Sequence, residues 1–216
     1  MEQFCQDRDL LAMEPMLFGT SDSAAQALLV SQDGTINGQA LSCPLADCCA
    51  AGIEPGMVAA VYADGNTEAA AYEILDVLPG MLTLSVLRAS PQQPAITPPP
   101  ADMVRFHVRT YAAQIRNTSA ALAEKLRQSR EAAGVRSASF ADSAQLRLTA
   151  VCGALADIFV ARAHNAREND ANWVKAQHYR QEFSRLQLSL RLAVDADGDG
   201  IAEATRTLGN VTLRRI

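Results

Sequence analysis

The residues best suited to metal chemistry lie near the C-terminal end of the sequence, in the segment Asp195-Ala-Asp197-Gly-Asp199-Gly200. Alternate carboxylates in a turn that contains glycine can direct several hard oxygens at one centre, as calcium requires. The twelfth position, where an EF-hand loop carries a bidentate glutamate, is Arg206, but the glutamate at the ninth position could replace it. The candidate calcium ligands are therefore Asp195, Asp197, Asp199 and Glu203.

The same acidic segment also fits a polar surface turn that binds no metal. It follows a predicted helix, and carboxylates at a helix C-terminus oppose the helix dipole, so a positive charge should lie nearby. Arg206, Arg214 and Arg215, or arginines of a neighbouring subunit, could supply that charge in place of a cation. Because short acidic matches to calcium motifs are often false, both interpretations stay open. We expect no other cofactor.

The cysteines and histidines predict no enzyme. The five cysteines have no framework spacing, and Cys43-x4-Cys48-Cys49 lacks the second cysteine pair or spaced histidine of a zinc motif. Reduced structural thiols are therefore a better interpretation of these cysteines than a soft-metal site. The histidines are dispersed, and the sequence contains no G-x-S-x-G, H-E-x-x-H or Walker motif.

Composition and charge further narrow the possible classes of protein. The 216 residues, 49% of them hydrophobic, suffice for one large domain or two small ones. The net charge of −5 argues against a surface that grips nucleic acid as the main function. Because we find neither a long apolar run nor the basic and apolar regions of a signal peptide, we expect no membrane span and a chain that stays in the cytoplasm.

Two long amphipathic helices should position the acidic segment. Apolar residues recur at helical spacing in both stretches. In the first they are Leu148, Val151, Cys152, Leu155, Ile158, Phe159 and Ala163, and in the second Trp173, Ala176, Tyr179, Phe183, Leu186 and Leu190. The polar segment 165–170 between the helices is short, so the helices should be antiparallel neighbours. A short strand should follow the acidic turn.

The residue pattern divides the chain into five parts. We predict an N-terminal arm (1–26), a β-rich domain (27–90), a proline-rich linker (91–101), a helical bundle (102–194), and an acidic turn with a C-terminal strand tail (195–216). The arm holds a short helix from Asp7 to about Glu14, and Gln32-Asp-Gly34 and Asn37-Gly38 are turn signals. The alternation in 103–110 predicts a strand that returns to the sheet, and 137–141 should be a loop.

The predicted fold class is α+β, an antiparallel helical bundle with a small β-rich, barrel-like domain. The second helix is apolar on more than one side at its C-terminal end. Burial under the β-rich region would explain this, and so would a subunit interface. The candidate oligomer-interface residues are Leu186, Leu188, Leu190 and Leu192.

Two segments resemble the head-to-tail connector (adaptor) proteins of tailed bacteriophages. One is the opening Asp7-Arg-Asp-Leu-Leu-Ala-Met-Glu-Pro-Met-Leu-Phe18. The other is the helix Ala176-Gln-His-Tyr-Arg-Gln-Glu-Phe183, which leads into Leu192-Ala-Val-Asp-Ala-Asp-Gly-Asp-Gly200 and a strand-forming tail. The resemblance covers the arm and about the last 80 residues, and it is one of arrangement.

This resemblance implies a structural virion protein of the phage neck, made in the bacterial host. Such proteins form a homo-oligomeric ring, commonly twelvefold, beneath the portal ring; the ring extends the DNA channel and receives the next neck or tail protein. DNA would pass through the lumen without specific binding, which suits an acidic chain. The tail, Val211, Thr212, Leu213, Arg214, Arg215 and Ile216, would reach the portal by adding a strand to a partner sheet. A stopper or tail terminator, or a calcium-binding module, are the alternatives.

Overall fold

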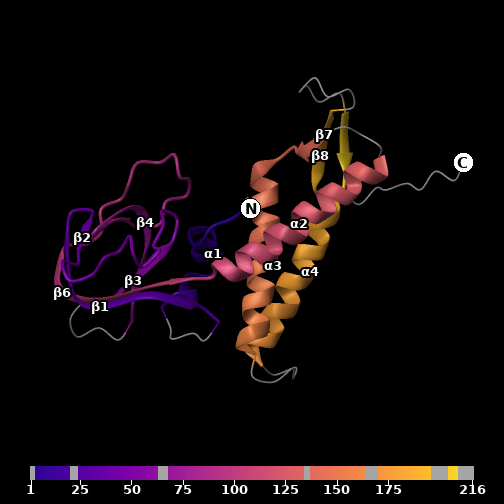
Figure 1. Cartoon of the computed structure of the whole chain (residues 1–216). Helices are drawn as coiled ribbons and strands as arrows, with labels where there is room; N and C mark the ends of the chain where they lie inside the picture. The colour runs from indigo at the N-terminus through magenta and orange to yellow at the C-terminus, as the bar shows by residue number, and fades with distance from the viewer. Residues whose placement is uncertain are drawn as a thin grey trace, which may run out of the picture. The chain divides into compact units, whose positions relative to one another are not determined.

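The computed structural model describes residues 3–19, 24–62, 68–133, 137–163, 170–195 and 204–208. The chain divides into two compact units (Figure 1). One consists of Gln6–Ala112, and the other combines Met1–Cys5 with Ala113–Ile216.

A closed antiparallel barrel of six strands forms the first unit (Figure 1). The order around the barrel is β1-β2-β5-β4-β3-β6, and pairing of β6 with β1 closes it. A helix and a 3₁₀ turn precede the barrel. The elements are α1 (Asp7–Met13), η1 (Pro15–Leu17), β1 (Gln26–Asn37), β2 (Ala40–Ser42), β3 (Val58–Tyr62), β4 (Ala70–Leu78), β5 (Met81–Ser85) and β6 (Ala101–Thr110).

The barrel closes because β1 is long and irregular. Its register with β6 shifts between Ser31 and Gly34 and again after Gly34, so the strand bends as it runs along β6. A Cβ at Gly34 would lie 2.9 Å from side-chain atoms of Phe106 and Val104. Gln32-Asp33-Gly34 is therefore a bend inside a strand, and the predicted turn there is wrong. The Asn37-Gly38 turn is confirmed, with Gly38 at φ 61° between β1 and β2.

The proline-rich stretch lies within the barrel unit. It joins β5 to β6, and its Ile96 forms an isolated bridge with Val86. The predicted returning strand is confirmed as β6, which pairs with both β1 and β3. The unit boundary consequently falls after Ala112, at the start of the next helix.

The described residues of the second unit form three helices and a three-stranded sheet in the order β7-β8-β9. Its elements are α2 (Ala112–Ala133), β7 (Ser137–Phe140), α3 (Ser143–Arg162), α4 (Ala171–Ser189), β8 (Arg191–Asp195) and β9 (Ala204–Thr207). The predicted loop at 137–141 is wrong, because 137–140 pairs with β8. Asp142 caps α3 and accepts hydrogen bonds from the backbone N–H groups of Ala144 and Gln145.

The predicted helical hairpin is confirmed. Hydrogen bonds join opposite ends of α3 and α4, from Gln145 Nε2 to Ser189 O at 3.1 Å and from Asn172 Nδ2 to Arg162 O at 3.5 Å. The rings of Phe159 and Tyr179 stack between the helices with centroids 5.8 Å apart. By length and composition α3 could cross a membrane, with mean hydropathy 1.4, but buried core helices pass the same test, and 61% of its most apolar window is buried.

The predicted antiparallel helical bundle is wrong, and the fold is mixed α+β. Of the described helices only α3 and α4 run alongside each other, while Figure 1 shows α2 running across them. The crossing is close at Gly153 of α3, where a Cβ would lie 2.5 Å from Thr118 Cγ2 of α2. The bundle prediction failed because its apolar spacings were local, whereas much of the chain forms strands paired over long sequence distances. The barrel-like region fits the prediction in part.

Candidate functional site

The four candidate interface leucines do not lie together on one helix. α4 ends at Ser189, and Leu190 has extended backbone with ψ 131°. Leu192 belongs to β8, opposite Phe140 of β7. Leu186, Leu190 and Leu192 are buried, whereas Leu188 is 64% exposed. Three of the four predicted contacts are thus packed inside the chain, and only Leu188 is available to another molecule.

The helix ends here because its last turn is replaced by sheet contacts. The N–H of Leu208 donates to the carbonyl of Leu190 at 2.8 Å, and the N–H of Ala141 donates to that of Arg191 at 2.9 Å. These partners come from segments before α3 and after β9. The spacing of Leu186, Leu188 and Leu190 in the sequence does not indicate these backbone partners.

The acidic segment connects β8 to β9. Val194 of β8 pairs with Ala204 of β9, and residues 195–203 join these two paired positions in the sequence. Asp195 is the last residue of β8, where its backbone lies opposite Ser137. Asp197, Asp199 and Glu203 lie outside the described residues, as does the predicted partner-binding tail Val211–Ile216. The backbone of Arg206 lies in β9, opposite Leu192.

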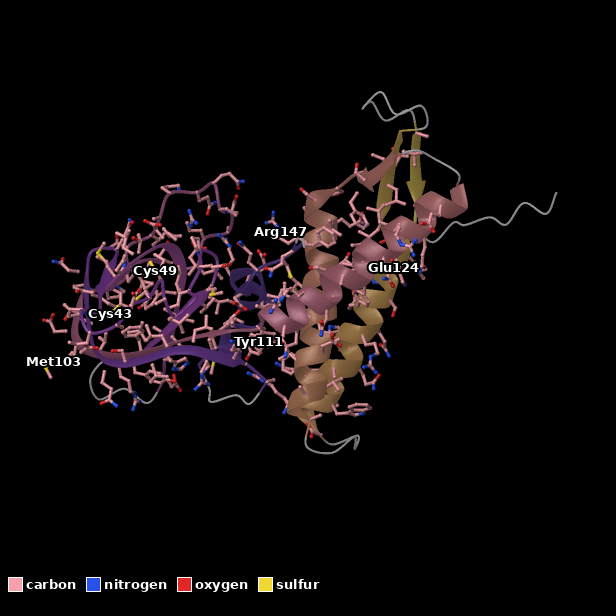
Figure 2. All side chains as sticks on the ribbon, viewed as in Figure 1. Cys43, Cys49, Met103, Tyr111, Glu124 and Arg147 are labelled. Carbon is pink, nitrogen blue, oxygen red and sulfur yellow. The ribbon has the colours of Figure 1, made fainter. Side chains whose placement is uncertain are left out.

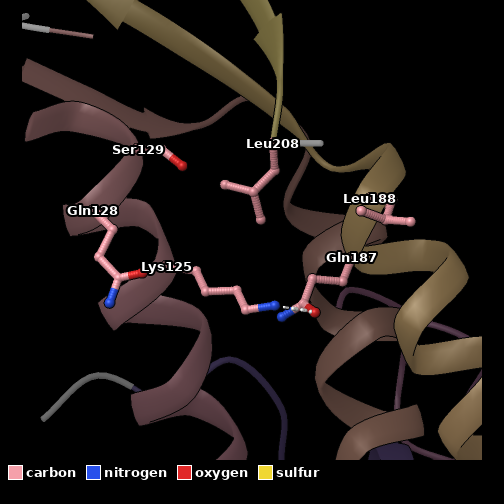
Figure 3. Close-up of a pocket in the computed structure, with 6 residues that line it drawn as sticks. All are labelled: Lys125, Gln128, Ser129, Gln187, Leu188 and Leu208. Atoms are coloured by element: carbon pink, nitrogen blue, oxygen red, sulfur yellow. Dashed lines mark hydrogen bonds between the residues drawn. The ribbon is translucent and has the colours of Figure 1, made fainter. Parts of the chain in front are cut away.

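A small pocket lies where α2, the end of α4 and Leu208 meet (Figure 3). Its volume is about 210 Å³, and it is lined by Lys125, Gln128, Ser129, Gln187, Leu188 and Leu208. Lys125 Nζ donates a hydrogen bond of 2.5 Å to Gln187 Oε1, and the Gln187 side chain is otherwise buried. This bond ties α2 to α4 beside the exposed Leu188. The pocket therefore lies at the junction of the α3–α4 hairpin with the sheet β7-β8-β9.

The described residues contain no cluster of three or more histidine, cysteine or acidic side chains that could hold a metal ion. Cys43 and Cys48 are buried in the barrel core with their sulfurs 3.3 Å apart, and Cys49 is exposed (Figure 2). Burial and the neighbouring Cys48 raise the pKa of Cys43 to about 12. The thiol of Cys43 therefore stays protonated at neutral pH.

The histidines do not form a catalytic pair among the described residues. His107 is buried in β6, where its Nε2 lies 3.1 Å from the carbonyl oxygen of Phe18, and burial lowers its pKa. His178 packs against the ring of Tyr179. His164 lies outside the described residues.

A buried group of three charges was not predicted from the sequence. Glu73 of β4 is 1% exposed; its Oε2 lies 2.6 Å from Arg8 Nη1 of α1, and its Oε1 accepts a hydrogen bond from Arg88 Nε. Arg8 also donates to the Arg88 carbonyl at 2.9 Å, and Arg88 donates to the carbonyls of Pro91 and Gln93. The triad thus fastens α1 and the segment after β5 to the barrel.

Asp7 holds the start of the same arm. The N–H of Tyr111 donates to its Oδ1 at 2.9 Å, and burial raises the pKa of Asp7 to about 6. Tyr111 also donates through its hydroxyl to the carbonyl of Leu17 at 3.2 Å, and its ring packs edge-on against Phe18 (Figure 2). Asp7 does not cap α1, whose capping box is formed by Gln6 and Asp9. The contact between Asp7 and Tyr111 was not predicted because the two residues are far apart in the sequence.

Met103 of β6 marks an irregular point on the barrel surface. It has φ 50° and is 83% exposed, at the register shift where β6 passes Thr35 of β1. Such bulges redirect a side chain away from the sheet. Figure 2 shows Met103 projecting from the barrel.

Comparisons with known proteins gave no match for this chain, whether to a family model, a curated protein or a solved structure.

Proposed function

We propose that this chain is a structural virion protein, a head-to-tail adaptor in the neck of a tailed bacteriophage. It would form a homo-oligomeric ring beneath the portal and extend the DNA channel toward the tail. The proposal includes no catalytic role. It rests on the arrangement of the N-terminal arm and of the last part of the chain, together with the features below.

The observation that carries the proposal is the sheet at the end of the second unit. Among the described residues β9 pairs with β8 alone, so it is an edge strand of the sheet β7-β8-β9. The free N–H and C=O groups of an edge strand can pair with a strand of another chain. Residues 208–216 follow β9 in the sequence, and they include the strand-forming pair Val211-Thr212. This supports assembly by strand addition.

The surface of α2 supports a second contact. Of its described side chains only Ile115, Thr118, Ser119 and Leu122 are buried, so this helix of 22 residues presents most of its surface outward. Glu124, Arg127 and Glu131 form a surface ion-pair row there. A long polar helix with so narrow a buried stripe suits packing against a neighbouring subunit through polar contacts. We therefore propose that the ring contact uses α2 and Leu188, because Leu186, Leu190 and Leu192 are buried within the chain.

Electron microscopy of the purified protein, alone and mixed with the portal ring encoded in the same genome, tests the proposal. Rings, or a collar on the portal, are the expected results. Deletion of Val211–Ile216 should abolish the collar, and Thr212→Pro should weaken it, because proline removes an N–H from the added strand. Thr212→Val is the matched control and should assemble normally.

Two results would count against this proposal. If the deletion variant still formed the collar, strand addition by the tail would be excluded. A collar on another neck ring, and none on the portal, would assign the chain to the stopper or tail-terminator class.

A calcium site in the acidic turn is the second candidate function. It is favoured by the pairing of Val194 with Ala204, which brings together the residues on either side of 195–203. Alternate carboxylates in such a short segment suit a hard cation. Calcium should raise the melting temperature, and Asp197→Ala should remove the rise. No shift at millimolar calcium would exclude the site.

A further inference from the structure

The turn that follows β2 brings two cysteines together in the barrel. Cys43 is the first residue after this strand, and its N–H donates to the carbonyl of Gly80 at 2.8 Å. The N–H of Ala46 donates to the Cys43 carbonyl at 3.0 Å, and that of Ile53 donates to the Cys48 carbonyl at 3.3 Å. Backbone hydrogen bonds therefore hold both cysteines in place on the barrel.

The two thiols meet inside the barrel core. Both side chains are fully buried, among Leu41, Leu82 and the other core residues. Their sulfurs are 3.3 Å apart, close enough for an S–H···S hydrogen bond. A disulfide needs a sulfur separation of about 2.05 Å. The remaining approach of roughly 1 Å is within reach of small side-chain rotations.

We propose that Cys43 and Cys48 are a site of reversible disulfide formation, oxidised by a low-molecular-weight disulfide or a peroxide. With oxidised glutathione, one thiolate attacks the reagent and releases one glutathione thiol. The second cysteine then attacks the mixed disulfide and releases the other. The two protein thiols lose two protons and two electrons, and one oxidised glutathione becomes two reduced molecules.

The fold controls the rate of this reaction. Because burial and the adjacent thiol disfavour the Cys43 thiolate, the reactive form is scarce while the turn is closed. Reagents must enter when the segment 43–53 opens, so the pair should oxidise more slowly than the exposed Cys49 reacts. Conditions that favour local opening, such as low urea, should accelerate the oxidation.

The bond would fix an exposed apolar residue. Leu45 lies between the two cysteines and is 89% exposed. A disulfide would close the six-residue segment 43–48 and restrict the backbone that carries Leu45, so a partner binding there would lose less conformational entropy. The inference goes beyond the neck role and does not depend on it.

The test uses the full chain carrying Cys49→Ser, which leaves four thiols of the five. The reduced protein is incubated with oxidised glutathione, and free thiols are then counted after unfolding. The count should fall from four to two, with an intact mass lower by about 2 Da, and dithiothreitol should reverse both changes. Peptide mapping should find the Cys43–Cys48 link, and Cys5 and Cys152 should remain reduced.

Three results would overturn the proposal. One is a thiol count that stays at four under conditions that oxidise a control dithiol peptide. A second is a link that involves Cys5 or Cys152. The third is protection of Cys43 and Cys48 by added zinc with no disulfide at any glutathione concentration, which would indicate a metal site instead. Cys43 and Cys48 are not mutated in this test. Its result therefore does not depend on whether a variant at either position folds.

Discussion

Replacing Glu73 by glutamine should weaken the barrel unit strongly, because it removes the carboxylate that lies between two guanidinium groups. Glu73 is 1% exposed, and the side chains of Arg8 and Arg88 are largely buried beside it. Glutamine has nearly the same shape, so the substitution changes the charge and little else. Two buried positive charges would then face each other without their counter-ion.

The size of the effect follows from the geometry. An ion pair with charge centres about 4 Å apart gains roughly 4 kcal/mol at an effective dielectric constant of about 20. Glu73 makes two such pairs, and repulsion between the arginines offsets part of the gain. Removing one partner of a buried pair typically costs about 3–5 kcal/mol. With a urea dependence of about 2 kcal/mol/M, the unfolding midpoint should fall by about 2 M.

The single tryptophan makes the assay selective. Trp173 lies in α4 of the second unit, so its fluorescence follows that unit, while far-UV circular dichroism also follows the barrel. In Glu73→Gln the dichroism transition should shift to lower urea, and the fluorescence transition should shift less. Glu182→Gln, which breaks an exposed pair with Arg185, is the matched control and should leave both transitions in place.

A triple variant separates charge from packing. Replacing Arg8 and Arg88 by methionine and Glu73 by leucine removes all three charges together, and it should recover most of the lost stability. A Glu73→Gln midpoint within about 0.3 M of the wild type would refute the reasoning, because it would mean that water already screens the triad.

Two further predictions concern close packing and pH. Gly153→Ala should destabilise the second unit by about 1–3 kcal/mol although alanine favours helix, because its Cβ would lie 2.5 Å from Thr118 Cγ2; Thr118→Ser should restore part of the loss in a thermal melt. Burial raises the pKa of Asp7 from 3.8 to about 6, so the folded state binds its proton more tightly than the unfolded state. The stability of the barrel unit should therefore be highest below about pH 4 with respect to this group, and should fall by up to about 3 kcal/mol as pH rises to about 6. Asp7→Asn should remove this fall in urea titrations at pH 4 and pH 7.

Local periodicity was enough to predict the two helices of the hairpin. The apolar residues of α3 and α4 repeat at helical spacing within each segment. The cap of α3 by Asp142 is likewise a local feature, because a cap and its helix are neighbours in sequence. These features depend on residues a few positions apart.

The barrel and the charged triad depend on residues far apart in sequence. The residues next to Gly34 in the sequence do not show that Phe106 and Val104 pack where its side chain would be. The glycine was therefore interpreted as a turn signal. Arg8 and Glu73 are likewise too distant in sequence for any spacing rule to pair them. Closure of a sheet is a property of strand order, which periodicity does not encode.

The four candidate interface leucines are separated in the fold for the same reason. Leu190 and Leu192 continue the apolar pattern of α4, but the chain leaves the helix at Ser189 because β7 and Leu208 offer backbone partners. Burial of these leucines within the chain removes them from any ring contact. An assembly surface must therefore be sought among residues that the fold leaves exposed.

Leu188 and Leu192 provide the test of that argument. Leu188 is 64% exposed on the last turn of α4, whereas Leu192 is 4% exposed in β8. Leu188→Glu should leave the melting temperature within about 2 °C of the wild type, because exposed substitutions change stability little. It should nevertheless abolish rings or portal collars if Leu188 lies in the ring contact. Leu192→Glu should instead unfold the second unit, because it buries an unpaired charge. A Leu188→Glu protein that is stable and assembles fully would exclude this end of α4 from the interface and leave the exposed face of α2 and the tail to provide it.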